Sequence, residues 1–363
     1  MESSTPAPDA ALDAPHDALA PDAADVETQR RPVRVKWYRC PVPREELSQL
    51  NKRSDLLGLA QTVGFLAVVL GGAALAISSM HVWPWYVTAL LVLLNGHTWH
   101  FLINGFHELV HESVFRTRWL NGVFLRVLSF LGWYNHHFFW ASHTEHHKFT
   151  LHPPDDQEVV LPQNFDLRNL WKQGIINWRY PYYALRGTVR TAAGHVDGGE
   201  WAQHLFPQSN VEGRRKLRNW ARVLLVGQGL LLAGALALGW WVWPLVFTFP
   251  MMFGGWLHAL CNSSQHIGLQ DNVPDFRRCC RTIYLSPPLQ FLYWHMNFHT
   301  EHHMYAAVPC YNLPRLHRLI RHDMPPCPRG LVETWRQITE IQRRQKEDPS
   351  YQYEAPLPTA SAT

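Results

Sequence analysis

Four long stretches without Asp, Glu, Lys or Arg dominate the pattern of apolar and polar positions along this chain. They cover residues 56–79, 82–106, 223–242 and 243–262. Each approaches the roughly 20 residues that a helix needs to cross the hydrocarbon layer of a membrane. Buried helices of a large soluble domain are the alternative, but the four stretches pair into two hairpins with one consistent charge pattern. We therefore expect an all-α integral membrane protein with four transmembrane helices in two hairpins.

The charged segments set the expected orientation of these hairpins. Both hairpin turns, SSMHVWPWY and GWWVWPL, are rich in Trp and lack Lys and Arg. The other helix ends are flanked by basic segments, which are RRPVRVK, RTRW, EGRRKLRNWAR and FRRCCR. Lys and Arg gather on the cytoplasmic side of membrane proteins. We expect both termini and the central segment 108–222 in the cytoplasm, where a helical cap holds the functional site. The shorter apolar stretch 120–134, interrupted by Arg126, is expected to lie on the membrane surface.

The two ends of the chain have the composition of disordered tails. Residues 1–30 are rich in Ala, Pro and Asp and lack the apolar core of a signal peptide, and residues 346–363 are similarly poor in apolar residues. One membrane domain is expected over residues 37–335. The net charge of +4 is mild, and no basic run carries interleaved aromatics, so no nucleic-acid partner is expected. The six cysteines form no CxxC pair and are interpreted as reduced thiols.

The 22 histidines contain a repeated pattern. The string HTEHH occurs at residues 143–147 and again at 299–303, and its spacing of i, i+3 and i+4 places three imidazoles on one helical face. A shorter motif, HELVH, spans residues 107–111, and one more histidine follows the fourth apolar stretch. The expected topology brings all of them to one side of the membrane. The set comprises His107, His111, His143, His146, His147, His266, His299, His302 and His303.

Clustered neutral imidazoles at this spacing are typical of a metal site. Nine histidines exceed the four ligands of a tetrahedral zinc ion, so two metal ions with open coordination positions explain their number better. Imidazole binds zinc, copper, iron and nickel alike. A membrane site facing a reducing cytoplasm favours iron and O₂ chemistry on an apolar substrate.

Two other functions fit part of the pattern. HELVH also matches the H-E-x-x-H motif of zinc proteases, with Glu108 as the general base. That interpretation leaves seven of the nine histidines without a role and does not explain the repeated HTEHH. A membrane metal-binding protein without catalysis is the other alternative.

The three histidine motifs, in this order and with an apolar hairpin between the second and third, resemble the integral-membrane fatty-acid desaturase and hydroxylase superfamily, a non-haem di-iron group. The resemblance covers about residues 37–335. It implies that the nine histidines bind two iron ions (Fe²⁺) and that O₂ is the co-substrate. Asn262 and His266 resemble an Asn-x-x-x-His pair of the family, in which the asparagine acts through water. The chain departs from the family where Met304–Tyr305 replaces Phe-Pro.

The resemblance implies an enzyme that introduces a double bond into a fatty-acyl chain or a similar lipid-like substrate. Hydroxylation at the same iron site, or desaturation of a small amino-acid-like metabolite, remains open. The chain has no HPGG haem stretch, flavin fingerprint or Cys₄ iron–sulfur spacing, so a separate ferredoxin or cytochrome with its reductase is expected to supply electrons. The basic segments 214–222 and 277–281 are candidate docking sites for that carrier, with positive charge that only marks the cytoplasmic side of the membrane as the favoured alternative. Membrane lipid is the other expected partner.

Further candidates surround the proposed ligands. Glu108, Glu145 and Glu301 lie within the histidine motifs and are candidates to accept hydrogen bonds from ligand imidazoles, with ordinary cytoplasmic surface charge as an equal alternative for each. His100 precedes His107 by two helical turns on the same face, inside an apolar stretch. It is a candidate to line a substrate tunnel, with an ordinary hydrogen bond to a neighbouring helix as the alternative.

Overall fold

The fold is helical throughout the part of the chain that the computed structural model describes, residues 34–163, 165, 167 and 175–358. Within these residues there are isolated β-bridges but no β-strand. The all-α prediction is therefore confirmed. The tail predicted over residues 1–30 lies outside the described residues.

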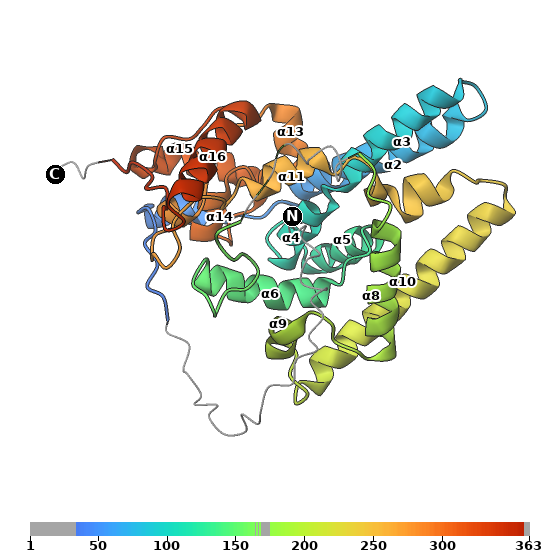
Figure 1. Ribbon diagram of the computed structural model, residues 1–363, viewed down its shortest axis with the longest axis horizontal. Coiled ribbons are helices and arrows are strands. Elements are labelled where there is room, and N and C mark those ends of the chain that lie inside the picture. Colours follow the sequence, from blue (N-terminus) through green and yellow to red (C-terminus); the bar gives the residue numbers. More distant parts are fainter. Residues whose placement is uncertain (1–33, 164, 166, 168–174, 359–363) are drawn as a thin grey trace.

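The first hairpin extends away from the rest of the molecule (Figure 1). It consists of α2 (Asp55–Ser79) and α3 (Trp85–Trp99), which pack against each other. The Ser54 side chain accepts a hydrogen bond from the Leu57 N–H and so caps the start of α2. Apolar side chains remain exposed around α2, including Leu56 and Val63. A helix that is apolar on all sides and only partly covered by protein fits a lipid environment.

The second apolar stretch is continued by α4 (Leu102–Val110), which follows α3 after a short break at residues 100–101. Together, Trp85–Val110 is one of three helical segments in the described chain that are long and apolar enough to cross a membrane. The other two are α2 and α10 (Val211–Ala237). Three of the four expected spans thus have a helical counterpart, with α10 beginning well before the expected residue 223.

The fourth expected span, residues 243–262, differs from the prediction because it is not one helix. It is divided into a π-helical turn η3 (Pro244–Thr248), a 3₁₀ turn η4 (Pro250–Met252) and α11 (Trp256–Ser263). Proline lacks the N–H that an α-helix requires, and Gly254 adopts a positive φ of 69° that ends the run before α11. Apolar composition alone did not show these interruptions.

The central segment supplies a group of helices that pack against α4, α10 and one another. These are α5 (Arg118–Leu131), α6 (His136–Phe149), α8 (Tyr180–Ala193) and α9 (Gly199–Leu205). α5 packs on α4, α8 packs along α10, and α6 contacts both α4 and α5 (Figure 1). The expected surface helix over residues 120–134 corresponds to α5.

The C-terminal part forms the remaining side of the fold, in orange and red in Figure 1. It contains α12 (Phe276–Cys279), α13 (Pro287–Leu292), α14 (His299–Met304), η5 (Cys310–Asn312), α15 (Leu313–Ile320), η6 (Arg321–Asp323) and α16 (Gly330–Glu347), and α1 (Arg44–Leu50) belongs to the N-terminal part. Residues 346–358, which the sequence analysis places in a disordered tail, are described here. The Tyr353 N–H donates to the Gly268 carbonyl at 3.0 Å.

One large apolar core joins these helices. Its fully buried members include Phe65 of α2, Phe106 of α4, Leu128 of α5 and Trp294. Burial of such side chains is the main driving force for folding. The core fixes α4, α6 and α14 relative to one another, and these are the helices that carry the histidine motifs.

Candidate metal centre

Four segments deliver the nine predicted ligands to one place. His107 lies in α4 and His111 directly follows it, α6 and α14 carry the two HTEHH strings, and His266 lies in the loop after α11. Every residue of α14 is buried. The i, i+3, i+4 spacing works as expected, because both strings are helical and each presents its three imidazoles together.

The structure brings the nine imidazoles together in two groups, each able to hold one metal ion. Within each group the ligand nitrogens all lie within 4.8 Å of one another. The five-histidine group contains His107, His111, His143, His147 and His302, and the four-histidine group contains His146, His266, His299 and His303. Both HTEHH strings contribute to both groups. The repeated string is therefore explained by geometry, since each copy must reach two neighbouring sites.

The spacing of the ring nitrogens tests whether these residues fit metal ions. The Nε2 atoms of His147 and His143 are 2.9 Å apart, and those of His299 and His266 are 2.8 Å apart. His302 to His147 and His303 to His299 each measure 3.1 Å between Nε2 atoms. Two nitrogens bound at a right angle to one metal, with bonds of about 2.0–2.1 Å as for zinc, are separated by about 3 Å. The nitrogen spacing matches this value.

The opposite ring nitrogens settle which tautomer several imidazoles adopt. His143 Nδ1 lies 2.9 Å from a Glu158 carboxylate oxygen, and His266 Nδ1 lies 2.8 Å from the Cys279 carbonyl. These oxygens accept, so Nδ1 carries the proton and Nε2 presents a lone pair. Lone pairs facing each other at 2.8–3.1 Å repel unless a cation lies between them. The arrangement of these ligand nitrogens therefore fits metal ions.

Burial keeps most of these imidazoles in the neutral form that binds metal, whereas at His146 the charge and hydrogen bond of Asp156 outweigh burial and raise the pKa. Burial lowers the pKa of His111, His143, His147, His302 and His303 well below the ordinary value. Neighbouring imidazoles lower these pKa values further, because adjacent positive charges repel. Neutral histidine is the metal-binding form.

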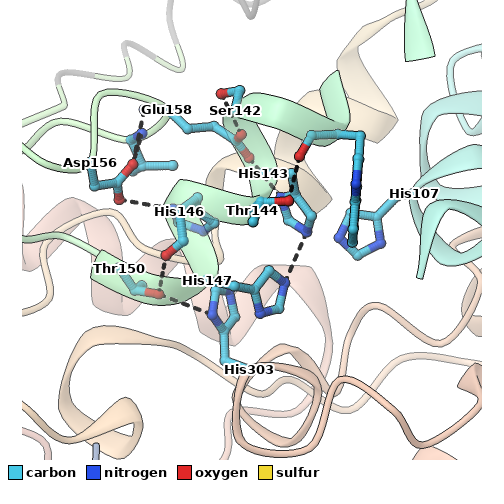
Figure 2. A network of polar contacts seen from close by, with 12 residues as sticks. His107, Ser142, His143, Thr144, His146, His147, Thr150, Asp156, Glu158 and His303 are labelled. Carbon is cyan, nitrogen blue, oxygen red and sulfur yellow. Dashed lines mark hydrogen bonds and ion pairs between the residues drawn. The ribbon is translucent and has the colours of Figure 1, made fainter. Parts of the chain in front are cut away.

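Two carboxylates that the sequence analysis did not identify hold the imidazoles of α6 (Figure 2). Asp156 Oδ2 accepts from His146 Nδ1 at 2.8 Å, and Glu158 accepts from both His143 Nδ1 and Ser142 Oγ. Burial acts to raise the pKa of Asp156, but His146 and the backbone N–H groups of Leu151 and Glu158 outweigh it and lower that pKa. Burial raises the pKa of Glu158 to about 7. Carboxylates in this position orient metal-binding imidazoles and increase their basicity.

Glu108 occupies the equivalent position behind the five-histidine group. Its Oε1 lies 3.1 Å from His107 Nδ1 and 3.5 Å from His302 Nδ1, and the side chain is buried. It therefore contacts the far side of these imidazoles. A general base of a zinc protease must instead reach the open side of the metal, so this position does not match the protease alternative.

The other predicted neighbours lie elsewhere. Glu145 forms an ion pair with Lys148 at 2.8 Å, and Glu301 accepts from Thr282 Oγ1 and His317 Nδ1 and does not contact a ligand imidazole. Asn262 lies in α11, and its side chain makes no hydrogen bond within the described residues. His100 Nε2 donates to the Phe253 carbonyl at 3.2 Å, between η4 and α11, and a position of His100 in a substrate tunnel stays a prediction.

The basic segment 277–281 is mostly occupied by internal contacts. Arg277 pairs with Asp275 and Asp323, and Arg281 donates to the carbonyls of Ser264 and Ile267. Both guanidinium groups thus stabilise the loop that carries His266 and its surroundings. Of the two segments considered for carrier docking, 214–222 keeps more of its basic side chains at the surface.

Within the described residues, a helical fold with three membrane-length apolar helices and two histidine groups that could each hold a metal ion is the pattern of a membrane protein with a candidate metal centre. The sequence matches the fatty acid desaturase family over residues 82–335. It is also 23% identical over 278 residues to the sn-1 oleoyl-lipid 12-desaturase of Arthrospira platensis, a match that covers 69% of this chain and 72% of that protein. The protein belongs to the fatty acid desaturase family and is thereby an oxidoreductase.

Proposed function

We propose that the protein is a membrane-bound desaturase that uses two iron ions, O₂ and an external electron donor to introduce a double bond into a fatty-acyl chain or a similar lipid-like substrate. The observation that carries this proposal is the pair of histidine groups that share α6 and α14. The lipid desaturase named above supports a chain-like substrate. Imidazole ligands alone do not select the metal. Iron is favoured over zinc because the family acts as an oxidoreductase and zinc has no redox chemistry.

The overall reaction must balance two electrons from outside. A CH₂–CH₂ unit, O₂, two electrons and two protons yield a CH=CH unit and two water molecules. Bound iron supplies the O₂ activation needed to remove hydrogen from an unactivated C–H bond. A separate ferredoxin or cytochrome with its reductase supplies the electrons.

The residues of the chain itself hold and shield this chemistry. The nine imidazoles provide the ligand nitrogens, while Asp156, Glu158 and Glu108 fix the ring orientations from behind. Burial of α14 keeps water away from one side of the centre. This pre-organisation would hold the ligand nitrogens in place for the iron ions that supply the O₂ chemistry. The basic helix-flanking segments support a location of the centre and both termini on the cytoplasmic side.

The reaction is tested by expressing the protein with a ferredoxin and its reductase and comparing lipids and polar metabolites by mass spectrometry. The expected result is a species that lacks two hydrogens and is absent when His143 is replaced by Ala. A species that has instead gained one oxygen would contradict desaturation and establish hydroxylation. If neither product forms although iron is bound and electrons are supplied, both the desaturation and the hydroxylation proposals are contradicted.

A further inference from the structure

Three histidines outside the metal centre lie near the α3–α4 break, with His258 buried and His97 and His100 half-buried. His97 lies in α3, His100 caps its end and His258 lies in α11. The rings of His100 and His258 are 6.3 Å apart and nearly parallel, and His258 is only 6% exposed. His100 precedes His107 by seven residues, about 10 Å along a helix axis. Polar residues within a membrane span are costly and commonly mark a functional site.

Two irregular stretches of backbone make room for this histidine cluster. The break between α3 and α4 lies at His100, and the interruption of the expected fourth span lies just before α11. A Cβ at Gly254 would lie 2.0 Å from His97 Nδ1, and one at Gly255 would lie 2.9 Å from His100 Cε1. The two glycines thus let two imidazoles approach the backbone. Irregular backbone at membrane depth is tolerated where it is buried in protein or lines a cavity.

The hydrogen bonds show what the cluster can offer a ligand. His97 Nδ1 lies 2.8 Å from the Leu93 carbonyl, and His100 Nε2 lies 3.2 Å from the Phe253 carbonyl. A carbonyl only accepts, so these nitrogens are protonated and the other nitrogen of each neutral ring is an acceptor. His258 makes no hydrogen bond within the described residues, and its Nε2 is fully buried. A neutral imidazole has one N–H and one acceptor nitrogen, so His97 and His100 each keep an acceptor nitrogen outside these bonds, and His258 uses neither its N–H nor its acceptor nitrogen within the described residues.

Aromatic rings surround these acceptors. Trp256 packs edge-on against His97 at 5.1 Å, and Phe101 does so against His258 at 5.3 Å. Tyr293 lies 6.4 Å from His258. An unpartnered polar group in such apolar surroundings costs about 1–3 kcal/mol, so a ligand that supplies a donor is favoured over one that does not.

We propose that His97, His100 and His258 bind the polar end of the substrate, and that this end carries an O–H or N–H donor such as a hydroxyl, amide or amine. The proposal rests on the desaturase function for the position of the site relative to the metal centre. A polar end fixed here, with the chain directed toward His107, sets which carbon atoms reach the oxidant. These three histidines are therefore specificity-determining residues.

The test measures equilibrium binding of four probes with the same chain to the protein in lipid nanodiscs, with empty nanodiscs subtracted. The probes are dodecanol and dodecylamine, which carry donors, and dodecyl methyl ether and dodecane, which do not. The wild type is compared with His258→Phe and His100→Phe, which keep a ring but remove its nitrogens. His81→Phe in the exposed α2–α3 turn is the matched control.

The wild type and His81→Phe are expected to bind at least one donor probe about tenfold more tightly than the ether, as one or two hydrogen bonds allow. Both cluster variants are expected to lose this preference while retaining bound metal and helicity. Preference for dodecylamine identifies an amine end, and preference for dodecanol identifies a hydroxyl end. Equal binding of ether, alcohol and amine by the wild type would overturn the proposal, as would an unchanged preference in both folded variants.

Probe binding requires neither O₂ nor electrons. A failure of the desaturase function therefore leaves the binding preference intact, whereas a failure of the polar-end proposal leaves the reaction intact. The two outcomes are distinguishable in the same preparation.

Discussion

At the scale of single residues, the ring nitrogen that faces away from the metal is as informative as the one that faces it. Asp156 is the best example, since it is fully buried, accepts from His146 and also binds the Leu151 N–H. It therefore joins the α6 imidazoles to the loop that follows them. Loss of such a partner weakens a metal site without removing a ligand.

We predict that Asp156→Ala lowers iron affinity by about 10–100-fold, because His146 loses the carboxylate that orients it. Glu145→Ala is the matched control, since Glu145 lies in the same helix as His146 and, among the described residues, forms its ion pair with Lys148. The measurement is a metal titration of the purified protein. Equal affinities for the two variants would show that the carboxylate does not support the site.

A second prediction concerns stability at Glu301. This buried carboxylate accepts from Thr282 and His317, and His317 Nε2 lies 2.8 Å from the Tyr284 hydroxyl. We expect His317→Ala to destabilise the fold by about 1–3 kcal/mol, because it leaves buried polar groups without a partner. The exposed His322→Ala is the control, and thermal unfolding is the measurement. An unchanged melting temperature for His317→Ala would contradict this account.

Helical spacing in the sequence singled out eight of the nine histidines, and His266 was added from its place after the fourth apolar stretch and from the family resemblance. The sequence did not identify Asp156 and Glu158, although PPDDQE follows the second histidine motif closely. A carboxylate after a helix is usually solvated, and only the return of this loop toward α6 buries these two. For the same reason, Glu145 was expected near the ligands although it faces Lys148.

At the scale of elements, α3 packs directly on the interrupted stretch that replaces the fourth span. Gly96 makes this possible, since a Cβ there would lie 2.5 Å from the Phe253 carbonyl and 2.8 Å from that of Pro250. Backbone atoms cannot move aside as a flexible side chain can. This contact fixes the position of α3 relative to the chain segment before α11.

We predict that Gly96→Ala destabilises the protein by about 1–3 kcal/mol through overpacking. Gly229→Ala in α10 is the control, because nothing lies within 4 Å of its Cβ position. Alanine there is expected to be neutral or to add up to about 1 kcal/mol through helix propensity. The stabilities of the two variants are compared by measuring their unfolding in the same detergent. Equal stability of the two would contradict the close approach.

The apolar pattern predicted α2, α3 with α4, and most of α10, because continuous charge-free helices leave a clear signal. It failed at residues 243–262, where Pro244, Pro250 and Gly254 interrupt an equally apolar stretch. Hydropathy measures transfer to lipid and carries no information on backbone continuity. The interruption was visible only in the positions of Pro and Gly.

At the scale of the whole molecule, orientation in the membrane rests on the distribution of Lys and Arg. We predict that a cysteine at residue 81, in the α2–α3 turn, reacts with an impermeant maleimide in intact cells. Ser209→Cys, equally exposed but before α10, is expected to react only after permeabilisation. The background carries Cys327→Ser, because the other five native cysteines are buried. The reverse pattern would invert the proposed topology.

The division of the histidines into two groups is the central claim, and the metal content of the purified protein tests it most directly. We predict two iron ions per chain, and about one in His111→Ala and in His266→Ala, each of which removes a ligand that belongs to one group alone. Elemental analysis gives the stoichiometry, and Mössbauer spectroscopy shows whether the two ions are coupled. A single zinc ion per chain, unaffected by His266→Ala, would contradict the account.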